Sequence, residues 1–100
     1  MTYDSKLKSE FIDELFDAFM LLESKEEYYR FFEDICTIKE IQSLAQRLKV
    51  AKLLREKKTY NEIEEITGTS TATISRINRC LSYGADGYNL VLDRLEKKEG

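Results

Sequence analysis

With 100 residues, no proline, four glycines and a formal net charge of −3, the chain fits a single, nearly all-helical domain over residues 1–100. Histidine and CxxC pairs are absent, and no nucleophile, base and orienting group occur together, so we expect no metal, no cofactor and no enzyme activity. The longest apolar stretch, Ala18 to Leu22, is far shorter than the ~20 residues that cross a bilayer, and the N-terminus lacks the basic start of a signal peptide, which predicts a cytoplasmic protein without membrane contact.

Capping signals divide the chain into helices. Ser or Thr followed three residues later by Glu lets two side chains bind backbone amides that are free at a helix start. The sequence has three such pairs, and Gly68 and Gly84 supply helix stops; the pairs are Ser24 with Glu27, Thr37 with Glu40, and Thr59 with Glu62. The sequence therefore predicts six helices, near residues 5–22, 25–35, 38–57, 60–67, 71–82 and 87–98.

The first two predicted helices carry more apolar side chains than one contact face requires. A monomer this small hides only roughly 60 to 70% of the surface that its unfolded chain exposes, so an apolar excess favours association. We therefore expect a homodimer; the alternative is a large core within one chain. Cys36 and Cys80 have apolar helical neighbours and are expected to be buried, reduced thiols.

The third predicted helix is basic although the chain as a whole is acidic. Residues 1–36 contain ten acids and four bases, a charge of −6, whereas residues 37–100 contain nine acids and twelve bases, a charge of +3. Within residues 37–58, seven bases minus two acids give +5. A phosphate backbone is expected to dock there, with Lys49 and Lys52 as contacts.

Residues 59–81 have the layout of a helix-turn-helix. Ile63 and Ile66 are expected on the inner face of its first helix, and Gly68 supplies the left-handed turn that other L-residues resist. The second helix then packs against the first through an i, i+3, i+7 stripe of Ile74, Ile77 and Leu81.

The outer face of this second helix has no acid between Thr69 and Tyr83. Small hydroxyl side chains and alanine let a helix enter the major groove, where Ser or Thr binds base edges or phosphates and Ala contacts thymine methyls. A tight helical turn alone would explain Gly68, but not the acid-free face together with the basic helix. The expected DNA contacts, besides Lys49 and Lys52, are Thr69, Ser70, Thr71, Ala72, Thr73, Ser75, Arg76 and Arg79.

Two segments are distinctive: residues 44–55, LAQRLKVAKLLR, and residues 68–76, GTSTATISR. With them, the sequence from Glu40 to Leu81 resembles the Trp repressor family, most closely its YerC/YecD branch, and ATISR is the most specific string. The resemblance implies six helices per subunit and an interlaced homodimer in which the N-terminal helices of both chains wrap one another. It also implies that residues 60–81 read DNA, the Trp repressor being a standard example of the helix-turn-helix.

The resemblance also implies a place for an effector. In the family repressor, tryptophan lies beneath the reading helix between two arginines, which Arg47 and Arg76 match, and Thr37 matches a nearby pocket threonine. The glycine expected after the second arginine is Ile77 here, and the serine three positions later is Cys80. Because isoleucine adds side-chain carbons where glycine leaves space for the indole, we do not expect tryptophan to be a corepressor.

Taken together, these features predict a sequence-specific, DNA-binding transcriptional regulator of the repressor type, with double-stranded DNA as its partner. The alternative is a helical protein–protein adaptor that uses the same pair of helices without binding DNA. A salt-dependent shift of duplex DNA separates the two hypotheses.

Overall fold

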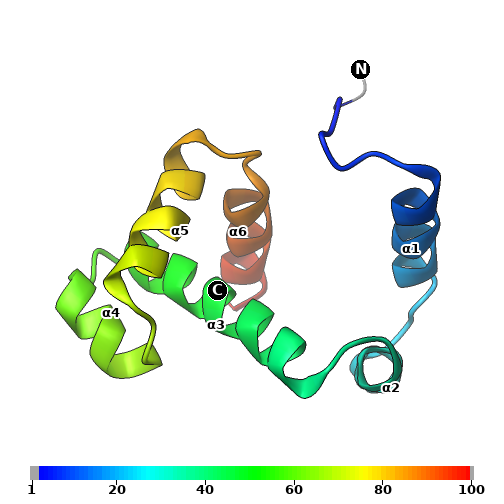
Figure 1. The fold of residues 1–100 in the computed structure, drawn as a ribbon, viewed down its shortest axis with the longest axis horizontal. Coiled ribbons are helices and arrows are strands. Elements are labelled where there is room, and N and C mark those ends of the chain that lie inside the picture. Colours follow the sequence, from blue (N-terminus) through cyan, green and yellow to red (C-terminus); the bar gives the residue numbers. More distant parts are fainter. Residues whose placement is uncertain (1–2, 100) are drawn as a thin grey trace. The chain divides into compact units, whose positions relative to one another are not determined.

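A computed structural model describes residues 3–99, and over this range the chain is all-α, with six helices and no strand (Figure 1). The helices are α1 (Glu10–Met20), α2 (Lys25–Ile35), α3 (Ile38–Arg55), α4 (Tyr60–Thr67), α5 (Thr71–Tyr83) and α6 (Gly87–Glu99). They belong to two compact units, one up to Ile38 and one from Lys39 onward. The six-helix, all-α prediction is confirmed, and the single domain over residues 1–100 stays a prediction.

The helix boundaries agree closely with the predicted ones, and two differ for identifiable reasons. The first helix begins at Glu10 and not near residue 5, because the Ser9 side chain caps it by accepting a hydrogen bond from the Ile12 amide. The third helix ends at Arg55, two residues early, and Lys57 just beyond it has left-handed backbone angles, with φ of 67°.

One of the predicted capping boxes is complete. At the start of α4, the Glu62 amide donates to Thr59 Oγ1 at 3.1 Å and the Thr59 amide donates to Glu62 Oε1 at 2.9 Å. The hydrogen bond from the Thr59 amide to the carboxylate is the main cause that lowers the pKa of Glu62. At the start of α2, Ser24 accepts from the Glu27 amide, but the Glu27 carboxylate accepts from the Glu23 amide and not from that of Ser24. The pair of Thr37 and Glu40 stays a prediction.

The two glycine stops are confirmed, but they work in different ways. Gly68 ends α4 in the left-handed region, with φ of 70°, and its amide donates to the Glu64 carbonyl at 2.8 Å. Gly84 ends α5 with φ of −85°, which any residue can adopt. A Cβ there would lie 2.6 Å from the Cys80 carbonyl oxygen, so this glycine is required by a close approach of the backbone.

The core of the second unit joins α3, α4, α5 and α6. Its buried side chains are Val50, Ala51, Leu53, Ile63, Ile74, Ile77 and Leu92. Leu81 packs against them, so the predicted apolar stripe of α5 is confirmed. The prediction for Ile66 is wrong, because this side chain is 56% exposed: Tyr60, Ile63 and Thr67 take the i, i+3, i+7 positions that face inward.

The first unit pairs α1 with α2 through aromatic rings. The ring of Phe19 lies 5.6 Å from that of Phe31 and 5.3 Å from that of Phe32, measured between centroids. Neither helix has a buried residue, and Phe11 and Met20 are 85% and 82% exposed. The apolar excess expected from the sequence is therefore present and uncovered in the single chain, while the homodimer itself stays a prediction.

Candidate nucleic-acid interface

The helix-turn-helix predicted between residues 59 and 81 is present as α4, a turn over residues 68–70, and α5. The two helices lie side by side in the second unit (Figure 1) and share the buried side chains of Ile63 and Ile74. A polar contact reinforces them, since the Asn78 amide group donates to the Tyr60 hydroxyl at 3.3 Å. The pair therefore presents α5 as a supported helix with one free face.

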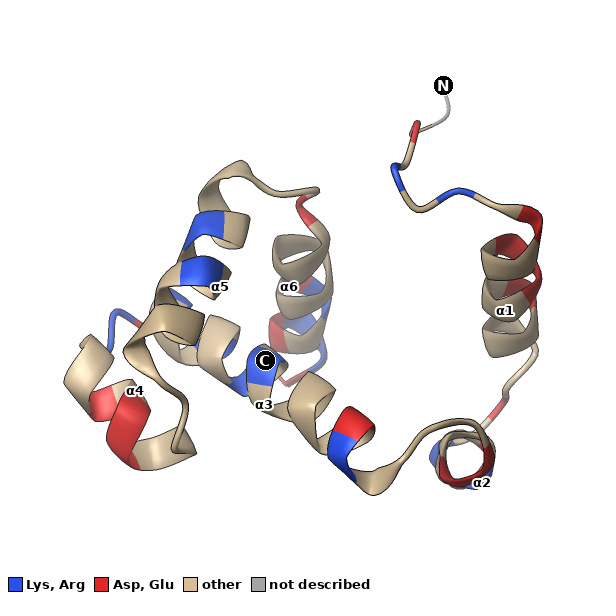
Figure 2. Cartoon of the chain, in the orientation of Figure 1, with Lys and Arg blue, Asp and Glu red and all other residues tan. Residues whose placement is uncertain are grey.

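The free face of α5 consists of small polar side chains and two arginines. Figure 2 shows basic residues and no acidic residue along this helix. No carboxylate between residues 3 and 99 pairs with Arg76 or Arg79, so both guanidinium groups are available to an anionic partner. The predicted contact residues that the structure leaves exposed on this face are Ser70, Thr71, Ala72, Ser75, Arg76 and Arg79.

Two of the predicted contact residues are placed differently. Thr69 is buried, with 6% of its surface exposed, and its hydroxyl oxygen lies 2.9 Å from that of Thr67. Thr73 is half-buried, its amide donates to Ser70 Oγ at 3.3 Å, and its hydroxyl accepts from the same atom. The hydroxyl groups at positions 69 and 73 thus hold the turn and the start of α5, and we leave Thr69 out of the proposed contact surface.

Only some of the basic side chains of α3 are free of ion pairs and so available to a phosphate backbone. Lys49 is exposed and Lys52 is half-buried, and neither forms an ion pair with any residue that the structure describes. Arg55, by contrast, pairs with Asp93 at 2.6 Å and with Glu96 at 3.4 Å, and the hydrogen bond to Asp93 raises the pKa of Arg55. The charge of +5 counted over residues 37–58 therefore overstates what this helix offers to phosphate.

One polar residue that the sequence did not single out contacts the turn. The side-chain amide of Gln46, on α3, donates a 2.6 Å hydrogen bond to the backbone carbonyl of Thr67. Residues 21 positions apart carry no local signal of such a contact, because periodicity and capping patterns report only on near neighbours.

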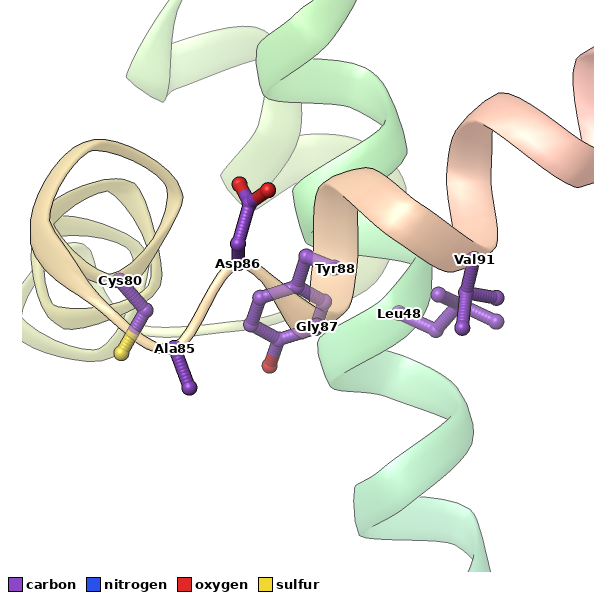
Figure 3. A pocket seen from close by; sticks show the side chains of 7 residues that line it. All are labelled: Leu48, Cys80, Ala85, Asp86, Gly87, Tyr88 and Val91. Atoms are coloured by element: carbon purple, nitrogen blue, oxygen red, sulfur yellow. The ribbon is translucent and has the colours of Figure 1, made fainter. Parts of the chain in front are cut away.

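The effector pocket predicted around Thr37, Arg47, Arg76, Ile77 and Cys80 stays a prediction, but one cavity of the second unit lies close to part of it. The structure has an open, mainly apolar cavity of about 510 Å³ beside the turn between α5 and α6 (Figure 3), lined by Leu48, Cys80, Ala85, Asp86, Gly87, Tyr88 and Val91. Of the predicted residues only Cys80 lines it; Ile77 is buried in the core, 4% exposed, and Thr37 belongs to the first unit. Burial raises the pKa of Tyr88, Cys80 acts in the same direction, and the charge of Arg47 opposes them.

The expectation of two buried thiols is wrong in the single chain. Cys80 is exposed and Cys36 is only half-buried, and no disulfide joins them. The inward positions of α5 are taken by Ile74, Ile77 and Leu81, so Cys80 lies outside that stripe.

Residues 3–99 contain no group of three or more Cys, Asp or Glu side chains that could hold a metal ion. Over the same range, none of the helices combines the length and apolarity needed to cross a membrane.

Comparisons with known proteins agree with this geometry. Residues 10–96 match the model of the family described as Trp repressor protein. The chain is 57% identical over 94 residues to YerC of Bacillus subtilis (strain 168), an uncharacterized protein, covering 94% of this chain and 90% of YerC. A TrpR-like protein from Eubacterium eligens has a crystal structure with a TM-score of 0.87 and 57% identity, over 91% of this chain and 94% of that one. The crystal structure of a protein from Staphylococcus aureus that is described as a Trp repressor gives a TM-score of 0.86 and 54% identity, over 91% of each chain.

Proposed function

We propose that this chain, which belongs to the Trp repressor family, is a sequence-specific DNA-binding transcriptional regulator. The family is one of DNA-binding regulators and not of enzymes. The observation that carries the proposal is the exposed face of α5, which combines small side chains, two unpaired arginines and no acid. A repressor acting on double-stranded DNA in the cytoplasm is the form of regulation that we infer.

In this proposal the residues divide by the part of DNA that they contact. Thr71, Ala72 and Ser75 are exposed on the reading helix, and we infer that they meet base edges in the major groove. Basic side chains on α3 and α5 meet phosphates, which fix the position of the protein on the duplex without reading sequence. The first turn of α5 also favours phosphate, because its free amides carry the positive end of the helix dipole.

The phosphate role of α3 is testable with single substitutions. We expect Lys49→Ala to weaken binding to all duplexes alike and to lower the slope of log K against log salt by about one, since one phosphate contact is lost. The equivalent change Lys97→Ala, at the exposed C-terminal end of α6, serves as the matched control and should leave the slope unchanged. The measurement is fluorescence anisotropy of a labelled duplex over a series of salt concentrations.

The same titration separates this function from its alternative. An adaptor that uses α4 and α5 to bind another protein gives no salt-dependent binding to duplex DNA, with or without Lys49. Equal salt slopes for the wild type and Lys49→Ala would instead remove Lys49 from the proposed contact surface.

Tryptophan is not expected to be the effector. Ile77 occupies the position at which the family has glycine, and its side chain packs in the core with Ile74, so we infer that no space is left beneath α5 for an indole. Titration calorimetry with L-tryptophan should give no measurable heat of binding, and the protein should bind duplex DNA in its absence. Micromolar binding of the amino acid, or DNA binding that depends on it, would contradict this inference.

A further inference from the structure

The turn between α4 and α5 is closed by a set of polar contacts around one hydroxyl. Thr67 Oγ1 donates to the Ile63 carbonyl at 2.7 Å, and the Thr69 amide donates to Thr67 Oγ1 at 3.2 Å. The Thr69 hydroxyl oxygen lies 2.9 Å from the same atom. Because a hydroxyl has one hydrogen and two lone pairs, all of its capacity is used when Thr69 donates its own hydroxyl hydrogen to Thr67.

The backbone carbonyl of Thr67 receives its partner from another helix. A helix leaves its last carbonyl groups without intrahelical donors, and Thr67 is the last residue of α4. The Gln46 side chain on α3 donates to this carbonyl at 2.6 Å, while Gly68 turns the chain with φ of 70°. Hydrogen bonds therefore join the two sides of the turn, through Thr67 and Thr69, and join the turn to α3, through Gln46.

These contacts lie immediately before the reading helix. Thr69 is buried and directly precedes Ser70, the N-cap of α5, so its position fixes where the helix begins and in which direction it leaves the turn. We propose that Gln46 and the pair of Thr67 and Thr69 form a polar lock that holds α5 in its DNA-binding pose, with Gln46 as a positioning residue that does not itself contact bases. This inference rests on the proposed function and adds to it a determinant of specificity.

The lock is expected to act on binding more than on stability. Gln46 is exposed and lines a polar groove of about 460 Å³ with Lys39, Gln42, Ser43 and Thr67, so water can replace its amide when the side chain is removed. The free energy of unfolding therefore changes little. The turn, however, gains conformational freedom, and DNA binding must order it again at a cost in affinity. In a dimer this cost is incurred at both reading helices.

The test compares Gln46→Met, which keeps the length of the side chain but cannot donate, with Gln42→Met, the same change one turn earlier in the same groove. The probes are a duplex selected by the wild-type protein from a random pool and a scrambled duplex of equal composition. We expect Gln46→Met to weaken binding to the selected duplex roughly tenfold, because a dimer loses one hydrogen bond at each of its two reading helices. Binding to the scrambled duplex should stay unchanged. Gln42→Met should match the wild type.

A second readout does not depend on DNA. Hydrogen exchange at the Gly68 and Thr69 amides should be faster in Gln46→Met than in the wild type, with the thermal midpoint nearly unchanged. Thr69→Val, which keeps the shape of a buried side chain and removes its hydroxyl, should speed the same two amides. If amide exchange at Gly68 and Thr69 is unchanged in both variants, the polar lock does not exist. If exchange is faster but the affinity for the selected duplex is unchanged, the lock does not position α5 for DNA binding.

These readouts also separate the lock from the function on which it rests. If the wild type binds no duplex at all, the proposed function fails. Because there would then be no DNA-binding pose to hold, the positioning role fails with it, whereas faster exchange would still support the polar contacts themselves.

Discussion

Thr71→Glu is expected to abolish binding to specific duplexes while helix content stays at its wild-type value and the unfolding midpoint does not fall. Thr71 is the first residue of α5 and is exposed, so the new carboxylate meets no core residue. An acid in the first turn of a helix stabilises it, because it interacts favourably with the positive end of the helix dipole. Against DNA, however, the same charge faces phosphates and base-edge acceptors, and like charges brought together cost several kcal/mol.

The size of this effect makes it a sharp test. With one new charge at each reading helix of a dimer, the loss of affinity should exceed about 100-fold at moderate salt. Ser75→Glu, one turn further along the same exposed face, should behave in the same way. Lys97→Glu is the control: it changes the net charge by twice as much at the end of α6 and should reduce binding only slightly. Equal losses for Lys97→Glu and Thr71→Glu would mean that net charge, and not the face of α5, governs binding.

A chain in which Phe11 and Met20 are both replaced by glutamate is expected to be monomeric at concentrations where the wild type is a dimer. The two side chains are 85% and 82% exposed in the single chain, so their replacement removes little from its own packing. If they lie in an interface, each contributes about 1.5 to 3 kcal/mol of apolar burial from each of two chains, and the dissociation constant rises by more than about 10,000-fold.

The dimer matters for function because it sets the spacing of the reading helices. Two such helices about 34 to 36 Å apart enter the major groove on one face of a duplex, so loss of the dimer should also abolish specific binding. Sedimentation velocity measures the oligomeric state, with Ile66→Glu as the control, since Ile66 is an exposed apolar residue of α4. A wild-type chain that sediments as a monomer at high concentration would refute the homodimer.

Local signals in the sequence were sufficient for the helices and for most of the candidate surface. The capping box joins Thr59 to Glu62, and the left-handed Gly68 donates to the Glu64 carbonyl, so each feature involves residues at most four positions apart. Both are found as predicted. The apolar stripe of α5, at Ile74, Ile77 and Leu81, follows the helical spacing i, i+3, i+7, so its inward face was equally clear. Charge counting was less successful, because it could not reveal that Arg55 is paired with Asp93 on α6.

The remaining differences come from contacts that local patterns do not contain. In α4, a helix of only 8 residues, two isoleucines at i and i+3 are both compatible with an inward face, and only the packing against α3 and α5 selects Ile63 over Ile66. Thr69 looked like a surface hydroxyl because the glycine turn is visible in the sequence, but the contact that it creates between the hydroxyl groups of Thr67 and Thr69 is not. Gln46 was missed because its partner, the Thr67 carbonyl, lies on another helix, 21 positions away.

The central claim is that this chain reads DNA through α5 without tryptophan, and selection of bound fragments from a pool of random duplexes tests it most directly. The wild-type protein, with no amino acid added, should enrich a single motif that is roughly palindromic, with half-sites about one helical turn apart. The Thr71→Glu protein should enrich nothing under the same conditions. A wild-type pool that remains random through repeated rounds would contradict the account.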